Sequence, residues 1–290
     1  MLADLACAIA DGSEVISDFR VLADQKELFG QVASVPTTWR TLSEIAAGGP
    51  ETLGRISMAG VQARCRAWAA VAARHGGLPG VQIADKVLEG VTCIRLDATV
   101  TAAHSDKELA EPNFKGAGRD DAPGQGGLEH GGRSPQGAGG LDRRAATGAP
   151  APADGDVRWC RCQPASQPDW RADPAYIDAA HRVHARVDDG IRTGKDCGIG
   201  RFPSHDFAIN SAWLAASLIA ATLLAWLRLL ALDAELARAE PKTLRYKILH
   251  AAARLTHSGR RHRLKISRTW PWARAIATAW TRLNALPQAP

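Results

Sequence analysis

The chain has 290 residues, of which 46% are hydrophobic, enough for one large domain or two ordinary ones with a sizeable core. The net charge of +6 hides an asymmetry, because residues 241–290 contain eleven Lys and Arg residues but neither Asp nor Glu. A tail of one charge sign indicates a polyanionic partner, either nucleic acid or an acidic membrane surface, and gives no support for a small-molecule substrate.

Residues 1–75 are predicted to be helical. The first segment is apolar at positions 2, 5, 6 and 9, which lie on one helix face, and Ser13 is placed to cap the segment that follows. A long Ala- and Arg-rich stretch then ends at the pair Gly76 and Gly77, as a helix does. We therefore expect residues 1–89 to form a helical N-terminal region.

The segment "GVTCIRLDATVT" at residues 90–101 is the clearest strand in the sequence, because its β-branched residues cluster behind Gly90. Asp97 lies in its middle. A carboxylate inside a buried strand is costly unless it is paired or binds a metal. The alternative is that the strand ends early and that Asp97 caps the next turn.

Residues 116–155 contain twelve Gly and four Pro, a composition that predicts disorder instead of a packed core. Cys160 and Cys162 follow, and with His181 and His184 they have the residue types of a zinc site. A spacing of one residue between the cysteines is unusual for structural zinc, so we do not favour this interpretation.

The six cysteines are scattered, and the N-terminus lacks a positively charged leader, so we expect a cytoplasmic, reducing setting.

The segment "YIDAAHRVHARVDDGIRTGK" at residues 176–195 predicts a helix with Gly194 as its C-cap. Helical spacing produces two faces. The apolar face comprises Ala180, Val183, Val187 and Ile191, and the polar face comprises His181, His184, Asp188 and Lys195.

Residues 207–227 contain no charge, and their number is sufficient for a membrane span. Four Ser, Thr and Asn residues interrupt the stretch, and many of its apolar positions are only Ala. We favour a buried central helix, with a single-span membrane protein as the alternative.

At the C-terminal end, "HSGRRHR" predicts a basic turn and "RLKIS" a returning strand, followed by Trp270, Trp272 and Trp280 among Arg residues. Basic and aromatic side chains together suit phosphate contacts and base stacking, although these Trp residues could equally belong to the core beneath a solvated hairpin. The candidate DNA-binding residues are Arg260, Arg261, Arg263, Lys265 and Arg268.

Long segments, among them "LPGVQIADKVLEGVTCIRLDATVTAAHSDKELAEPNFKG" and "AYIDAAHRVHARVDDGIRTGKDCGIGRFPSHDFAINSAWLAASLIAATLLAWLRLLAL", resemble bacterial insertion-sequence transposases of the DDE domain group 1 type. The resemblance covers about 1–116 and 171–290. It implies an α/β, ribonuclease H-like core, incomplete here, whose three carboxylates hold two Mg²⁺ ions for phosphoryl transfer on DNA. It also allows for a homo-oligomer. Residues 90–116 would supply the first core strand, 171–240 the C-terminal core helices, and 241–290 a basic C-terminal region.

The same resemblance assigns roles to individual residues. Asp97 in "IRLDAT" matches the first metal-binding Asp of the family, and Asp188 stands where the family has Glu in a Y-x2-R-x3-E-x6-K pattern. His181, His184 and Lys195 occupy the supporting positions of that pattern. Asp is one methylene shorter than Glu, and Mg²⁺ demands near-ideal geometry, so we expect reduced activity.

The family's second Asp is missing from residues 117–170. Back-translated with GC-rich codons, "ADGDVRWCRC" at residues 153–162 reads in another frame as Leu-Met-Val-Thr-Cys-Asp-Gly-Ala-Gly, which is similar to the family's motif at that Asp. We therefore hypothesise that residues 117–170 are translated out of frame. The sequence predicts a catalytically dead, nucleoid-associated transposase remnant, with a non-enzymatic DNA-binding remnant as the alternative.

Overall fold

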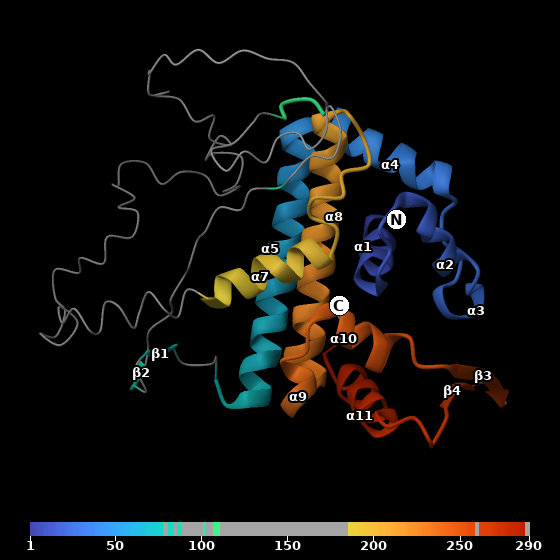
Figure 1. Ribbon diagram of the computed structural model, residues 1–290. Helices are drawn as coiled ribbons and strands as arrows, with labels where there is room; N and C mark the ends of the chain where they lie inside the picture. The colour runs from blue at the N-terminus through green and yellow to red at the C-terminus, as the bar shows by residue number, and fades with distance from the viewer. Residues whose placement is uncertain are drawn as a thin grey trace, which may run out of the picture.

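The computed structural model describes residues 1–77, 81–83, 86–88, 101, 107–110, 185–258 and 261–287 (Figure 1). Helices make up most of residues 2–75, as the sequence predicts, but the region expected to be helical, residues 1–89, also contains a β-hairpin. Its helices are α1 (Leu2–Asp11), the 3₁₀-helix η1 (Ile16–Phe19), α2 (Arg20–Ala23), α3 (Lys26–Phe29), α4 (Val35–Ala47) and α5 (Gly49–His75). A small antiparallel hairpin follows, formed by β1 (Val81–Ile83) and β2 (Lys86–Leu88). The strand predicted around Asp97 and the segment 117–170 lie outside the described residues.

The second described part begins within the helix predicted from residue 176. Its elements are α7 (Ala185–Asp196), α8 (Phe207–Trp226), the π-helix η3 (Leu227–Ala231), α9 (Ala234–Ala237), α10 (Pro241–Leu244), the π-helix η4 (Arg245–Leu249), β3 (Ala253–Ser258), β4 (Arg261–Ile266) and α11 (Ala273–Asn284). β3 and β4 pair antiparallel, so the returning strand is confirmed, while residues 259 and 260 of the predicted turn lie outside the described residues. Helices thus dominate the described residues, and their only strands are the two hairpins.

Local side chains set several helix ends. The Asp206 carboxylate accepts hydrogen bonds from the backbone N–H groups of Ala208 and Ile209, at 2.7 and 3.0 Å, and so caps α8. α5 ends at Gly76, whose φ of 74° lies in the left-handed region that glycine tolerates best. The predicted cap at Ser13 is wrong. Asp18 supplies that contact by accepting from the backbone N–H of Val15 at 3.2 Å.

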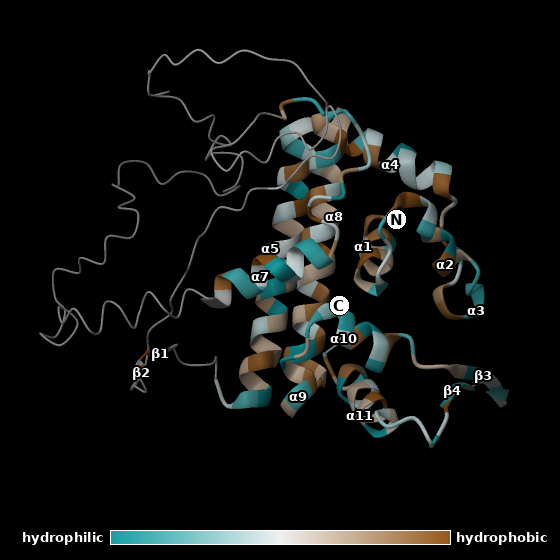
Figure 2. Ribbon diagram, viewed as in Figure 1, coloured by the Kyte–Doolittle hydropathy of each residue, from teal (hydrophilic) through white to brown (hydrophobic). Residues whose placement is uncertain are grey.

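α8 is the central helix of the main core (Figures 1 and 2). Leu5 and Ile9 of α1 belong to the same buried cluster as Trp213 and Ala216 of α8. Trp213 is fully buried, and its Nε1 donates to the carbonyl oxygen of Gly198 at 3.0 Å. Small side chains on both helices allow their backbones to approach closely, and burial of the larger ones supplies the stabilisation.

The stretch Phe207–Ala231 is also long and apolar enough to cross a membrane by length and composition. In the structure, α1, α4, α5 and α7 contact α8, and 33% of its most apolar window is buried. Four helices therefore pack on α8, while two thirds of that window are not buried, so both interpretations of this helix stay predictions.

A second, smaller core lies beneath the C-terminal elements. Leu232, Leu236, Leu244 and Ile248 are buried there, and Trp272 packs against them. The core holds α9, α10, η4 and α11 together, while the β3–β4 hairpin projects from the helical body (Figure 1). The hairpin is held at its base, and His257 in β3 lies 3.8 Å from the Glu27 carboxylate of α3.

Candidate nucleic-acid interface

α7 carries Asp188, the acid that the sequence analysis identified as a candidate metal ligand. Asp188 lies in the first turn of the helix and is exposed, and Lys195 is exposed two turns later on the same side. Val187 and Ile191 are half-buried, as the predicted apolar face requires. His181, His184 and Asp97 lie outside the described residues, so the structure does not test their approach to Asp188.

The prediction that Gly194 ends this helix is wrong, because α7 continues to Asp196. A Cβ atom on Gly194 would lie 2.6 Å from Cδ1 of Ile199, so this glycine is needed for close packing. The chain reverses at Gly198 and Gly200, whose φ angles of 89° and 98° suit glycine.

Asp189, the acid next to Asp188, makes a structural contact. Asp189 forms an ion pair with Arg192, and Arg192 also donates to Glu240 at 2.8 Å, which ties α7 to the segment before α10. Asp188 makes no hydrogen bond or ion pair within the described part of the chain. Its carboxylate suits a metal ion chemically. However, the described residues contain no group of three His, Cys, Asp or Glu side chains, so they do not by themselves form a metal site.

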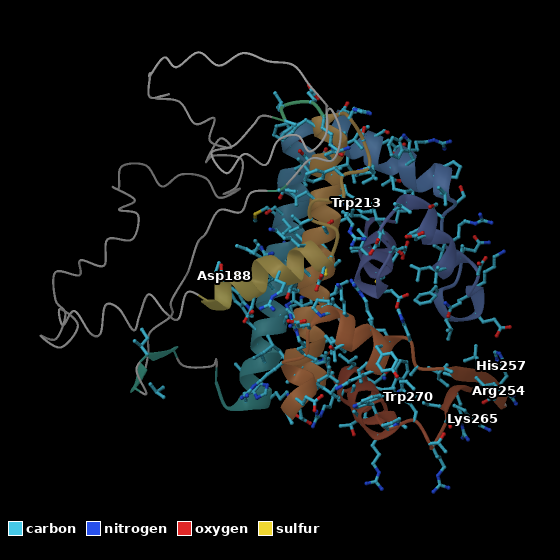
Figure 3. All side chains as sticks on the ribbon, viewed as in Figure 1. Asp188, Trp213, Arg254, His257, Lys265 and Trp270 are labelled. Atoms are coloured by element: carbon cyan, nitrogen blue, oxygen red, sulfur yellow. The ribbon has the colours of Figure 1, made fainter. Side chains whose placement is uncertain are left out.

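The β3–β4 hairpin separates its side chains into two kinds of face. Arg254 pairs directly with Lys265, and Thr256 pairs with Arg263, so these side chains share one face. Leu255 pairs with Leu264 on the opposite face. We call Arg254, Arg263 and Lys265 the cationic face of the hairpin (Figure 3).

All three side chains of the cationic face are exposed, and none forms an ion pair within the described residues. Like charges directly opposite each other destabilise a two-stranded sheet. The arrangement is therefore unfavourable for an isolated hairpin and becomes favourable when an anion lies across the face. Arg261 pairs with Ser258 in the same ladder, and Arg260 lies outside the described residues.

Other cations of the C-terminal region have structural roles. Arg245 donates to the carbonyl oxygens of Ile9, Ala10 and Asp196, at 2.8 to 3.0 Å, and so joins the ends of α1 and α7. Lys247 forms an ion pair with Glu235. In contrast, Arg268 and Arg274 are exposed and make no hydrogen bond or ion pair through their side chains in the described part of the chain, so they extend the available charge beyond the hairpin.

Aromatic residues lie next to the hairpin. Trp270 and Trp272 are half-buried, with ring centroids 5.4 Å apart, and Tyr246 contacts both edge to face. The Trp270 Nε1 donates to the carbonyl oxygen of Lys247 at 3.0 Å. These two Trp residues therefore anchor the base of the hairpin, whereas Trp280 on α11 is largely exposed.

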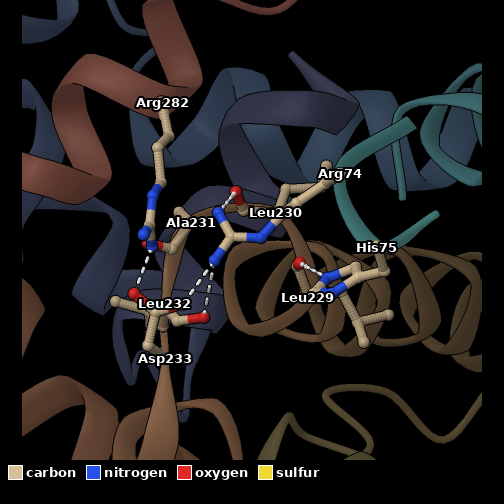
Figure 4. A network of polar contacts seen from close by, with 8 residues as sticks. All are labelled: Arg74, His75, Leu229, Leu230, Ala231, Leu232, Asp233 and Arg282. Atoms are coloured by element: carbon tan, nitrogen blue, oxygen red, sulfur yellow. Dashed lines mark hydrogen bonds and ion pairs between the residues drawn. The ribbon is translucent and has the colours of Figure 1, made fainter. Parts of the chain in front are cut away.

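A cluster of polar contacts fixes α11 and η3 against α5 (Figure 4). The Arg74 guanidinium donates to the carbonyl oxygens of Leu230, at 2.6 Å, and Leu232, at 3.2 Å, and to the Asp233 carboxylate at 2.6 Å. Arg282 of α11 reaches the same carboxylate at 2.6 Å. We call Arg74, Asp233 and Arg282 the α5–α11 clamp.

The clamp shifts the protonation equilibrium of the Asp233 carboxyl group. The hydrogen bond from Arg282 is the main cause that lowers the pKa of the Asp233 carboxyl below its usual value, and the nearby charges of Arg282 and Arg74 add to it. The clamp holds the C-terminal region against the N-terminal helices through residues far apart in sequence.

Sequence reasoning identified Arg263, Lys265 and Arg268 but missed Arg254. The signal was present, because a two-residue turn between alternating strands brings Arg254 opposite Lys265. Asp188 and the cationic face lie on opposite sides of the helical body (Figure 3). Asp188 and the basic hairpin are thus two separate features of the structure.

Comparison with protein families gives one result. The family model for transposase DDE domain group 1 matches residues 170–288, which include α7, α8, the β3–β4 hairpin and α11. No curated protein and no solved structure matches the chain. The matched segment contains both Asp188 and the cationic face. Over residues 170–288, the chain is therefore similar to the transposase DDE domain group 1 family.

Proposed function

We propose that this chain is a transposase-derived DNA-binding protein, in which the cationic face of the β3–β4 hairpin contacts the phosphate backbone. The observation that carries the proposal is the pairing of Arg254 with Lys265, beside Arg263, without a neutralising acid in the described part of the chain. Arg and Lys side chains on one open face suit phosphate oxygens, and such contacts depend little on base sequence.

The base of the hairpin is anchored, so its cations would move together. Trp270 and Trp272 hold its base against the second core, so the three cations would be presented on a fixed support. Arg268 and Arg274 lie beyond β4 and would continue the contact along a nucleic acid backbone. A face of this kind favours extended, regularly charged polymers over compact anions.

The binding claim is tested with a fluorescently labelled DNA duplex of arbitrary sequence, by anisotropy. The test variant is Arg254→Ala/Arg263→Ala/Lys265→Ala. The matched control is Arg40→Ala/Arg55→Ala/Arg66→Ala, which removes three exposed cations from α4 and α5. The proposal predicts a loss of affinity of about tenfold or more in the hairpin variant. Equal losses in the two variants would mean that net charge alone governs binding.

The hairpin variant should fold as well as the wild type. Removing like charges that face each other should leave the stability of the hairpin unchanged or raise it slightly. A weaker complex combined with an unchanged unfolding transition would therefore support direct contact with DNA.

For the chemistry, we propose a ribonuclease H-like core that has lost most or all of its activity. Asp97 and Asp188 would be the remaining metal-binding carboxylates, and the expected Mg²⁺ ions would supply Lewis-acid activation of the attacking and leaving oxygens. The second Asp of the family has no counterpart in residues 117–170, and Asp188 replaces the longer Glu. Two carboxylates with one shortened side chain are poorly suited to hold two metal ions.

The enzymatic alternative is tested by Mg²⁺-dependent nicking of supercoiled plasmid DNA, with wild type and Asp188→Asn side by side. We expect no nicking above background in either protein. Nicking by the wild type that disappears in Asp188→Asn would establish an active enzyme, and a normal anisotropy result in the same preparation would show that DNA binding is a separate property.

A further inference from the structure

An exposed aromatic ring lies near the base of the β3–β4 hairpin. Tyr246 in η4 is 62% exposed, whereas Leu244 and Ile248, two residues before and after it, are buried in the second core. The Tyr246 side chain therefore points away from that core. Its hydroxyl group makes no hydrogen bond within the described part of the chain, so neither burial nor a polar contact accounts for an aromatic residue at this position.

Two Trp side chains hold this ring in place. The ring centroid of Tyr246 lies 5.8 Å from that of Trp270 and 6.1 Å from that of Trp272, and both contacts are edge to face. Trp270 is fixed by its hydrogen bond to the Lys247 carbonyl oxygen, and Trp272 packs against the second core. An aromatic ring that is already oriented loses little conformational freedom when a ligand stacks on it.

The supported ring adjoins the cations of the hairpin. The pair of Arg254 and Lys265 is one rung from the base of the hairpin, and the exposed Arg268 lies between Lys265 and Trp270 in sequence (Figure 3). In a nucleic acid each base is joined to its phosphate through one sugar. A strand whose phosphates contact Lys265 and Arg268 would therefore carry its bases to the Tyr246 ring.

We propose that Tyr246 stacks on an unpaired base of single-stranded DNA whose phosphates lie on the cationic face. The proposal rests on the proposed function, because the cations bring the strand to the ring. In a duplex, neighbouring base pairs cover the faces of each base, whereas in a single strand those faces are open to an aromatic side chain. Every base has a π face, so the Tyr246 ring selects single strands without selecting a base sequence.

The charge around the ring favours a nucleobase over an apolar protein surface. Residues 241–290 contain neither Asp nor Glu, so the surroundings of Tyr246 in this segment carry positive charge alone. An apolar partner that covered the ring would also have to desolvate the cations beside it, and charged residues are depleted at the centres of protein interfaces. Single-stranded DNA supplies both a flat ring for Tyr246 and phosphates for the cations.

Fluorescence anisotropy with two labelled probes of equal length tests the preference, one an oligothymidylate and the other a blunt-ended duplex. The test variant is Tyr246→Leu, which keeps an apolar side chain but removes the π face, and Tyr246→Phe retains the ring. The matched control is Trp68→Leu, which removes a ring that is 52% exposed on α5.

Tyr246→Leu should lose about fivefold or more in affinity for the oligothymidylate and little or none for the duplex. Tyr246→Phe and Trp68→Leu should bind both probes as the wild type does. An unchanged affinity of Tyr246→Leu for the oligothymidylate, or an equal loss on both probes, would overturn the proposal. Dependence on Tyr246 that is confined to an oligouridylate would assign the ring to RNA and overturn it as well.

Photo-cross-linking of the wild type tests the contact without any substitution. An oligothymidylate that contains one 5-iodouracil is irradiated in the complex, because this base forms a photochemical bond to an aromatic ring that stacks on it. Peptide mass spectrometry should find the link at Tyr246, and the same base inside a paired duplex should give no such link. Links found only at other residues would contradict the stacking.

Failure of this proposal can be distinguished from failure of the proposed function. If the hairpin does not bind phosphates, Arg254→Ala/Arg263→Ala/Lys265→Ala binds both probes as the wild type does. If only the stacking is wrong, that variant loses affinity for both probes, while Tyr246→Leu and the wild type have the same ratio of single-strand to duplex affinity.

Discussion

Substituting Arg74 by Met tests whether the α5–α11 clamp holds the C-terminal region in place. The Arg74 side chain is 19% exposed, and the carbonyl oxygens that it contacts belong to the buried residues Leu230 and Leu232. Met retains most of the aliphatic packing and removes the donors. The substitution therefore measures the contribution of the hydrogen bonds separately from that of side-chain packing.

The expected loss follows from the contacts. Two hydrogen bonds from a charged donor to buried carbonyl oxygens contribute about 1.5 kcal/mol each. The ion pair with Asp233 adds only about 0.5 kcal/mol, because that carboxylate is 60% exposed and still pairs with Arg282. The free energy of unfolding should therefore fall by about 3 to 4 kcal/mol.

Urea unfolding followed by circular dichroism measures this difference. The matched control is Arg66→Met, which removes an exposed Arg from the same helix and should change stability by less than about 0.5 kcal/mol. The reasoning is refuted if Arg74→Met unfolds at the same urea concentration as Arg66→Met.

Three further predictions concern single side chains. Because its pKa is lowered in the folded state, ionised Asp233 stabilises the protein above its ordinary pKa, and this contribution is lost as the pH falls through the folded pKa. Asp233→Asn should therefore flatten the pH dependence of unfolding below that ordinary pKa. The buried Ser217 hydroxyl has no hydrogen-bond partner within the described part of the chain, so Ser217→Ala should raise the free energy of unfolding by about 1 kcal/mol, and a loss in the same urea assay would reveal a partner. Burial raises the pKa of the Cys197 thiol to about 11, so iodoacetamide at pH 8 should label it only after unfolding; rapid labelling of the native chain, seen by peptide mapping, would contradict its burial.

Local patterns predicted the parts of the fold that local chemistry determines. The end of α5 at Gly76 and the half-buried stripe of Val187 and Ile191 follow from spacing and backbone preference. The hairpin of β3 and β4 was predictable because a Ser-Gly pair at 258–259, followed by basic residues, separates two strand-like segments. In each case the partner of a residue lies within a few positions of it.

The features that sequence reasoning missed depend on side-chain packing, strand register or contacts between residues far apart in sequence. Arg74 lies 156 residues from Leu230, and nothing near either residue indicates that they meet. Gly194 was taken as a helix end because glycine often ends helices, but here the Ile199 side chain packs on it and the reversal occurs later. Arg254 was overlooked because only the register of the hairpin places it opposite Lys265.

The salt dependence of DNA binding tests the central claim most directly. Each phosphate neutralised by a cation contributes about −0.9 to the slope of log affinity against log salt concentration. Arg254→Ala/Arg263→Ala/Lys265→Ala should make that slope less negative by about 2 to 3, and the Arg40/Arg55/Arg66 control should leave it unchanged. An unchanged slope in the hairpin variant, or the same change in the control, would contradict a direct contact between the hairpin and DNA.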